Sequence, residues 1–383
     1  MKSGYLGFRH ALRAIGMALG ACAFLALSSA TAAQQPSVRP AAPPVAAATA
    51  PAASTAPQQP AKGSAEASAA IRVNPKWKVP RTPWGHPDLQ GVWTSDDMKG
   101  VAMSRQATYG TREYLTDAEF AARARQRENA RKVDDARAGT FRNEEGTREF
   151  GYTSMVIDPP DGRVPATVPA ARTRRQVTGT FGNGPWEKVQ DFSLYDRCIT
   201  RGVIGSITPA VYGNGVRIVQ SPDTVTITYE MVHDTRVIRL DNIPPLGDGI
   251  QQFMGDARGH WEGDTLVVES RNFTDRTAIG GARHSTQLHL TERFTRIDPQ
   301  MVDYVVRVED PETFTRPWTM RMTITEQAGY DVYEYGCHEG NNAMRNTLSA
   351  ERAYDKAAAE AKEKGLPPPE RVFEKVNGAD RAR

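Results

Sequence analysis

Between Gly215 and Cys337 the sequence is a succession of short segments in which apolar and polar residues alternate. Alternation with a period of two is typical of β-strands that bury one face. Turn signals separate several segments, among them Ser221-Pro222-Asp223 and Glu262-Gly263-Asp264. The segments are GVRIVQ, TVTITYEM, TRVIRLD, DTLVVESRNF, QLHLTERFTRID, MVDYVVRVED, WTMRMTIT and YDVYEYGC.

This spacing predicts a mainly β fold. We expect an antiparallel meander that forms a lipocalin-like barrel or a strongly curved half-barrel, because an open sheet would leave reactive edges. The strand that contains Trp93 should join it. An N-terminal surface helix is expected in LTDAEFAARARQRENARKVDDARAG, capped by Thr116 or Asp117. A C-terminal helix is expected in TLSAERAYDKAAAEAKEKG, with a cap at Ser349 and a stop at Gly365.

The first 33 residues have the layout of a secretory signal peptide. Basic residues precede an apolar run from Ala14 to Leu27, and small residues follow. Cys22 offers lipoprotein anchoring as an alternative, which ranks second because AFLAL continues the apolar run. Residues 34–72 are rich in Ala and Pro and predict a disordered linker. The protein is therefore expected in the periplasm or secreted, with no transmembrane segment in the mature chain.

The rest of the chain divides into three parts. Residues 73–212 form an N-terminal segment with the first strand, the surface helix and proline-rich loops, 213–340 the barrel meander, and 341–383 the C-terminal helix and tail. The net charge of +3 is small and no basic patch alternates with aromatic residues, so no nucleic-acid partner is expected. Nothing in the sequence defines an oligomeric state.

Cys198 and Cys337 follow the predicted signal peptide. In an oxidising compartment two cysteines more often form a disulfide than remain free, so we expect this pair to be bonded. Two buried free thiols are the alternative.

Three polar residues share the phase of apolar strand faces. They are His233, Glu292 and Arg316. An ionised Glu292 in an apolar cavity needs a cation or a raised pKa, and both outcomes suit proton transfer. We therefore expect His233 as the proton-transfer group, with Glu292 orienting it, Arg316 holding an anion and Tyr229 donating to a substrate oxygen.

The apolar faces also predict a cavity lining. The expected ligand-binding residues are Met231, Tyr304, Trp318, Met320 and Met322. The same residues would also suit a filled core. A barrel of this size can hold a small apolar or aromatic molecule at its mouth.

Three functional classes follow from this lining. We expect a cofactor-independent acid–base enzyme, a lyase, isomerase, hydratase or hydrolase, because ionisable groups in a cavity serve chemistry. The alternative is a non-catalytic, lipocalin-like carrier of a small hydrophobic ligand. A structural envelope protein with a filled barrel is the third class.

Metal and cofactor motifs are missing from the sequence. There is no HExxH helix, CxxC pair, P-loop, Gly-Xaa-Ser-Xaa-Gly elbow or dinucleotide fingerprint, so no cofactor is predicted. A metal site formed by His284, His289 and His338 is a minor alternative, since imidazole ligands must converge on one point.

Several stretches together resemble a large, mostly uncharacterised family of exported bacterial proteins, seen in acidobacteria and proteobacteria. The stretches are PDLQGVW, VIDPPDGRVP, RCITRG, IVQSPDTVTITYEMVHDTRVI, MGDARGHWEGDTLVVES, LTERFTRID, TRPWT and YEYGCHEGN. The resemblance covers most of residues 73–350 and implies export rather than an activity. More loosely, Gly91-Val92-Trp93 before a β-meander is similar to the start of a lipocalin, which implies a ligand-holding barrel by fold analogy.

Overall fold

The computed structural model describes residues 74, 76–136, 146–174, 186–241, 243–327 and 329–370. The predicted signal peptide, the predicted linker and the tail after residue 370 lie outside the described residues.

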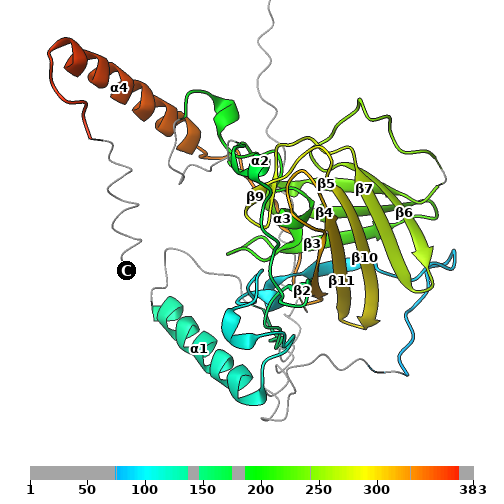
Figure 1. Cartoon of the computed structure of the whole chain (residues 1–383). Coiled ribbons are helices and arrows are strands. Elements are labelled where there is room, and N and C mark those ends of the chain that lie inside the picture. Colours follow the sequence, from blue (N-terminus) through cyan, green and yellow to red (C-terminus); the bar gives the residue numbers. More distant parts are fainter. Residues whose placement is uncertain are drawn as a thin grey trace, which may run out of the picture. The chain divides into compact units, whose positions relative to one another are not determined.

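A closed barrel of nine strands forms the centre of the described chain (Figure 1). Around the barrel the order is β1-β3-β4-β5-β6-β7-β10-β11-β12, and β12 pairs back to β1. The strands are β1 (Gly91–Thr94), β3 (Gly215–Gln220), β4 (Thr224–Tyr229), β5 (Thr235–Arg239), β6 (Asp256–Glu262), β7 (Thr265–Arg271), β10 (His289–Asp298), β11 (Met301–Glu309) and β12 (Trp318–Thr325). The predicted mainly β barrel, with the Trp93 strand as a member, is confirmed.

The barrel is mixed rather than wholly antiparallel. β5 and β6 run parallel and meet at Arg239 and Arg258, because the long connection after β5 returns the chain to the end where β5 began. The first and last strands close the barrel over a short pairing, in which Thr94 of β1 lies opposite Thr325 of β12. A short extra strand, β2 (Val156–Asp158), pairs with β12, and β8 (Ala278–Ile279) and β9 (Ala282–Arg283) form a separate small hairpin.

The described helices connect or follow the barrel strands. They are α1 (Asp117–Ala136), α2 (Pro169–Arg172), α3 (Val203–Ile207) and α4 (Ala343–Glu363), with 3-10 turns η1 (Asp96–Met98), η2 (Ala107–Tyr109), η3 (Val189–Asp191) and η4 (Met231–His233). Thr116 caps α1 as predicted: its hydroxyl accepts from the Glu119 amide, and the Glu119 carboxylate accepts from the Thr116 amide. The N-cap of α4 is Asn342, so the predicted cap at Ser349 is wrong, whereas Gly365 follows the helix with a positive φ.

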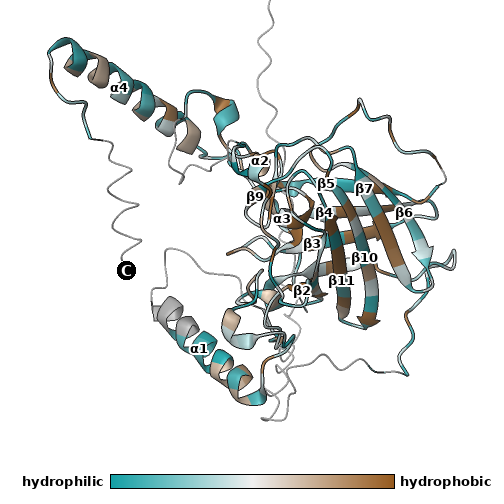
Figure 2. Cartoon of the chain, viewed as in Figure 1, coloured by the Kyte–Doolittle hydropathy of each residue, from teal (hydrophilic) through white to brown (hydrophobic). Residues whose placement is uncertain are grey.

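Alternate side chains of the strands fill the barrel. Figure 2 shows hydrophobic residues concentrated along strands such as β7, β10 and β11. The inward positions of β10 and β11 are fully buried, and Phe294 and Tyr304 pack with ring centroids 4.8 Å apart. Burial of this continuous apolar face is what stabilises the fold.

Two predicted strand segments differ in the structure. β4 ends at Tyr229 because Val232 and His233 adopt positive φ values of 69° and 48°, which no extended strand contains. The segment YDVYEYGC does not form a strand. The Glu230 carboxylate accepts hydrogen bonds from the Tyr333 amide and the Tyr330 hydroxyl. The Tyr333 amide therefore bonds to a side chain instead of to the backbone of a neighbouring strand.

Candidate functional site

A buried ion pair lies inside the barrel. Arg236 of β5 donates to both carboxylate oxygens of Glu292 on β10, at 3.0 and 2.6 Å. Their side chains are 2% and 0% exposed. Tyr304 of β11 donates to Glu292 at 3.0 Å, and Arg236 also donates to Tyr229 and Ser270. The carboxylate therefore accepts three hydrogen bonds, which is how a protein interior accommodates a charge.

Burial and the neighbouring charges shift the pKa values of Arg236, Tyr229 and Tyr304. Burial alone would lower the pKa of Arg236, but the attraction of Glu292 and of Tyr229, together with the hydrogen bonds to both, outweighs burial and raises that pKa. Burial raises the pKa of Tyr304, and the neighbouring Glu292 charge raises it further. Burial likewise raises the pKa of Tyr229. Tyr304 therefore stays a neutral donor to Glu292, Tyr229 stays a neutral acceptor from Arg236, and Arg236 stays charged as one member of a buried ion pair.

The predicted convergence of His233, Glu292 and Arg316 does not occur. His233 is exposed, and its Nδ1 lies 3.2 Å from the backbone carbonyl of Tyr335. The turn η4, which follows β4, removes His233 from the strand phase on which the prediction relied. Arg316 is exposed and lies just before β12. The arginine beside Glu292 is Arg236, in the place predicted for Arg316.

The predicted ligand-binding residues separate into two groups. Tyr304, Trp318, Met320 and Met322 are fully buried members of the barrel core, where Trp318 meets Phe314 edge-to-face. Met231 instead lines a pocket outside the core.

This pocket has a volume of about 480 Å³ and lies where β4 and β7 end and β3 begins. Three stretches of chain that are distant in sequence form its wall: residues 193–212 with α3, Met231 after β4, and residues 276–278 after β7. Apolar and aromatic side chains, among them Leu194, Tyr195 and Tyr212, line it. Its size is within the range of small-molecule sites.

Two arginines give the pocket a positive charge. Arg201 stacks over the Tyr195 ring at 5.9 Å, and its Nη1 is buried without a hydrogen-bond partner in the described part of the chain. Burial lowers the pKa of Arg201. Arg276 is half-buried, and no described carboxylate pairs with either arginine. The described lining contains no acidic side chain.

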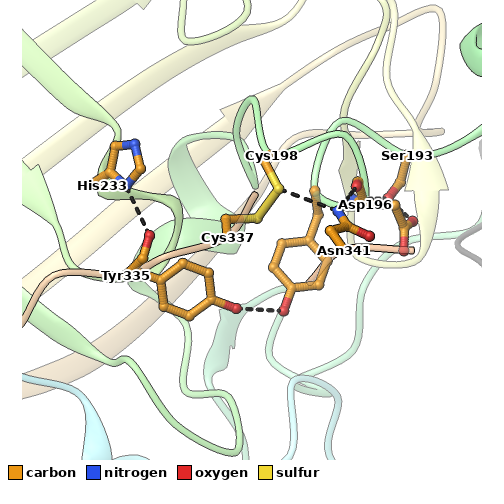
Figure 3. The surroundings of a disulfide bond; sticks show 8 residues. Ser193, Asp196, Cys198, His233, Tyr335, Cys337 and Asn341 are labelled. Atoms are coloured by element: carbon orange, nitrogen blue, oxygen red, sulfur yellow. Dashed lines mark hydrogen bonds between the residues drawn. A yellow bond between two sulfur atoms is a disulfide. The ribbon is translucent and has the colours of Figure 1, made fainter. Parts of the chain in front are cut away.

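A disulfide holds one wall of the pocket. Cys198 and Cys337 are bonded, as predicted, with their Cα atoms 5.7 Å apart. Figure 3 shows the bond beside Tyr335, whose carbonyl faces His233. The Tyr335 hydroxyl lies 3.2 Å from the hydroxyl of Tyr195, and its ring stacks on Tyr212. The bond therefore fixes the segment that supports two pocket tyrosines.

A hydroxyl–imidazole pair adjoins the same pocket. Thr277 lines the pocket, and its hydroxyl is hydrogen-bonded to Nε2 of the fully buried His284. The other ring nitrogen faces the carbonyl of Ser285 at 2.9 Å, so Nδ1 carries the proton and Nε2 accepts from Thr277. Burial lowers the pKa of His284, which keeps the ring neutral near pH 7.

The histidines considered for a metal site have separate surroundings. His289 lies on β10 between Glu269 and Glu309, and His338 is exposed. Within the described ranges, no three His, Cys, Asp or Glu side chains are grouped so that they could hold a metal ion.

Sequence reasoning missed Arg236, Arg201, Arg276 and Thr277. Arg236 had a signal, because it shares the apolar phase of Ile238 in TRVIRLD. The other three lie in irregular segments, where no periodicity indicates which side chains face a pocket.

Comparison of the chain with protein-family models, curated proteins and solved structures finds no match. None of the helices in the described ranges combines the length and apolar content that a membrane span requires.

Proposed function

We propose that this protein is exported and binds a small molecule with an apolar or aromatic body in the pocket beside the barrel mouth. The observation that carries the proposal is the pocket itself: about 480 Å³, lined by aromatic and apolar side chains, beside a barrel interior whose core side chains are buried. A rigid wall favours binding, because less conformational freedom is lost when the ligand arrives. The disulfide provides such a wall.

The periplasmic or secreted location remains part of the proposal. It rests on the predicted signal peptide, and the disulfide is compatible with it, since disulfides persist in oxidising compartments. Cell fractionation of the full-length protein tests the location: a cytoplasmic protein with residues 1–33 still attached would contradict it.

A pair of glycines supplies a matched test of binding. Gly205 lies in α3 and lines the pocket, and a Cβ atom added to it would lie 3.4 Å from Cβ of Arg201, which is an ordinary van der Waals contact. Gly205→Phe should therefore fill the pocket without straining the backbone. Gly249 is exposed, and a Cβ atom added to it would meet no atom within 4 Å, so Gly249→Phe is the control.

The probe is the uncharged fluorophore N-phenyl-1-naphthylamine. Its fluorescence is measured while the protein is titrated with it, which gives the affinity. The wild type and Gly249→Phe should bind it with similar affinity, and Gly205→Phe should lose most of that affinity. Equal binding by all three proteins, or no binding by the wild type, would contradict the pocket as the binding site.

An acid–base enzyme at the same pocket is the second candidate. The observation that favours it is the Thr277–His284 pair, because a hydroxyl bonded to a neutral, oriented imidazole is the arrangement of an activated hydroxyl. Incubation with a small-molecule extract, followed by mass spectrometry, separates the two classes. A natively retained ligand that stays unchanged supports binding alone. Turnover that Thr277→Val abolishes and Thr277→Ser retains supports the enzyme.

A further inference from the structure

We infer that the ligand of this pocket is an organic anion, an aromatic ring that bears a carboxylate or a similar acidic group. The inference rests on the proposed function and names the chemical class of its ligand.

Arg201 carries a desolvation cost that a bound anion would offset. A buried guanidinium N–H without an acceptor has lost hydration and has gained nothing in return. Nη1 of Arg201 is in this state in the described part of the chain. Arg276 adds a second positive charge from another segment of the wall, and the described lining offers no carboxylate to either. A bound anion would supply the missing acceptor.

The Arg201 guanidinium is held in one direction by an aromatic ring. Its Cζ atom lies 5.9 Å from the centre of the Tyr195 ring, so an aromatic face supports one side of the planar group. A supported guanidinium presents its N–H groups in a rigid fork, which matches a carboxylate better than a single neutral oxygen.

The tyrosines at the pocket carry no charge that opposes an anion. Burial raises the pKa of Tyr195, and burial together with the bonded Tyr195 raises the pKa of Tyr335. Both phenols are therefore neutral at physiological pH and add no negative charge that would repel an anion. The rings of Tyr195 and Tyr212 supply the apolar surface for an aromatic body.

The test uses two probes that differ in one group. 1-Anilinonaphthalene-8-sulfonate carries an acidic group, and N-phenyl-1-naphthylamine is the same molecule without it. The wild type should bind the sulfonate at least about tenfold more tightly, the scale of one hydrogen bond to a charged group. Arg201→Gln and Arg276→Gln should each remove about tenfold of the sulfonate affinity and leave the affinity for the uncharged probe within about twofold.

Arg293→Gln is the matched control. Arg293 of β10, whose side chain is 42% exposed, pairs with Glu262 at 2.8 Å, near the turn at the far end of β7 from the pocket. It should bind both probes as the wild type does. Arg276→Gln keeps the test valid if Arg201→Gln fails to fold, because Arg276 is half-buried and lies in another segment of the pocket wall.

The possible outcomes distinguish the anionic character of the ligand from the existence of the binding pocket. Equal wild-type affinity for both probes, with the binding of both lost in Gly205→Phe, would overturn the anion inference and leave the binding pocket standing. Failure of the wild type to bind either probe would overturn both. A sulfonate preference that survives both arginine substitutions would also overturn the inference, since the charge recognition would lie elsewhere.

Discussion

Removal of the Glu292 charge should destabilise the barrel strongly. Glu292→Gln keeps the size of the side chain but leaves Arg236 charged, with its side chain 2% exposed and its carboxylate partner gone. Glu292 accepts two hydrogen bonds from Arg236 and one from Tyr304. Breaking one side of a buried ion pair costs about 3–5 kcal/mol, so we expect a loss of about 4 kcal/mol.

The assay is urea unfolding of the wild type, both single variants and the pair. Arg236→Met with Glu292→Gln should be less destabilised than the sum of the two single variants, because the double variant buries no unpaired charge. Glu309→Gln is the control: among the described residues the Glu309 carboxylate pairs with Arg307 and His289, and its side chain is 35% exposed. It should change the free energy of unfolding by at most about 1 kcal/mol.

Two results would refute the reasoning. A Glu292→Gln protein within about 1 kcal/mol of the wild type would mean that Arg236 finds solvent or another partner, and the barrel interior would then be open rather than sealed. Strict additivity of the two single variants would mean that the residues do not interact.

Three further variants test other parts of the structure. Cys337→Ser should cost about 5 kcal/mol in urea unfolding, because the bond spans 139 residues of sequence; unchanged stability would show that the bond constrains nothing. Burial raises the pKa of Asp97 above 3.8, so the wild type should lose stability as the pH rises from 3.8 through that raised value. Asp97→Asn should remove this slope, and an identical pH profile would contradict the assignment. His233→Gln should leave the binding of N-phenyl-1-naphthylamine within about twofold, because this exposed ring bonds a backbone carbonyl outside the pocket lining; a large loss of affinity would return His233 to the site.

The barrel could be predicted because strands and turns leave patterns within short stretches of sequence. Strand alternation identifies inward residues such as Tyr304 and Met320, and turn signals place the hairpins. The parallel meeting of β5 and β6 could not be read from the same pattern, since it depends on the path of the connection between them. The disulfide followed from the number of cysteines and the expected compartment.

The site was harder to predict because it depends on register and on irregular chain. Arg236 and Arg316 both share an apolar phase, and only the closed register shows that Arg236 meets Glu292. The positive φ at Val232 removes His233 from the strand face. Such a φ is rare for a β-branched residue, so the sequence gives no reason to expect it. The pocket wall between residues 193 and 212 has no periodicity, so its inward side chains could not be identified.

Photoaffinity labelling tests most directly whether ligands bind in the pocket beside the barrel mouth. An aryl-azide derivative of N-phenyl-1-naphthylamine would be bound, irradiated and mapped by peptide mass spectrometry. We expect adducts in residues 193–212, at Met231 or in residues 276–278, and we expect these adducts to be lost in Gly205→Phe. Adducts on buried barrel residues such as Met320, or on the exposed apolar residues Ile250 and Phe253, would contradict it.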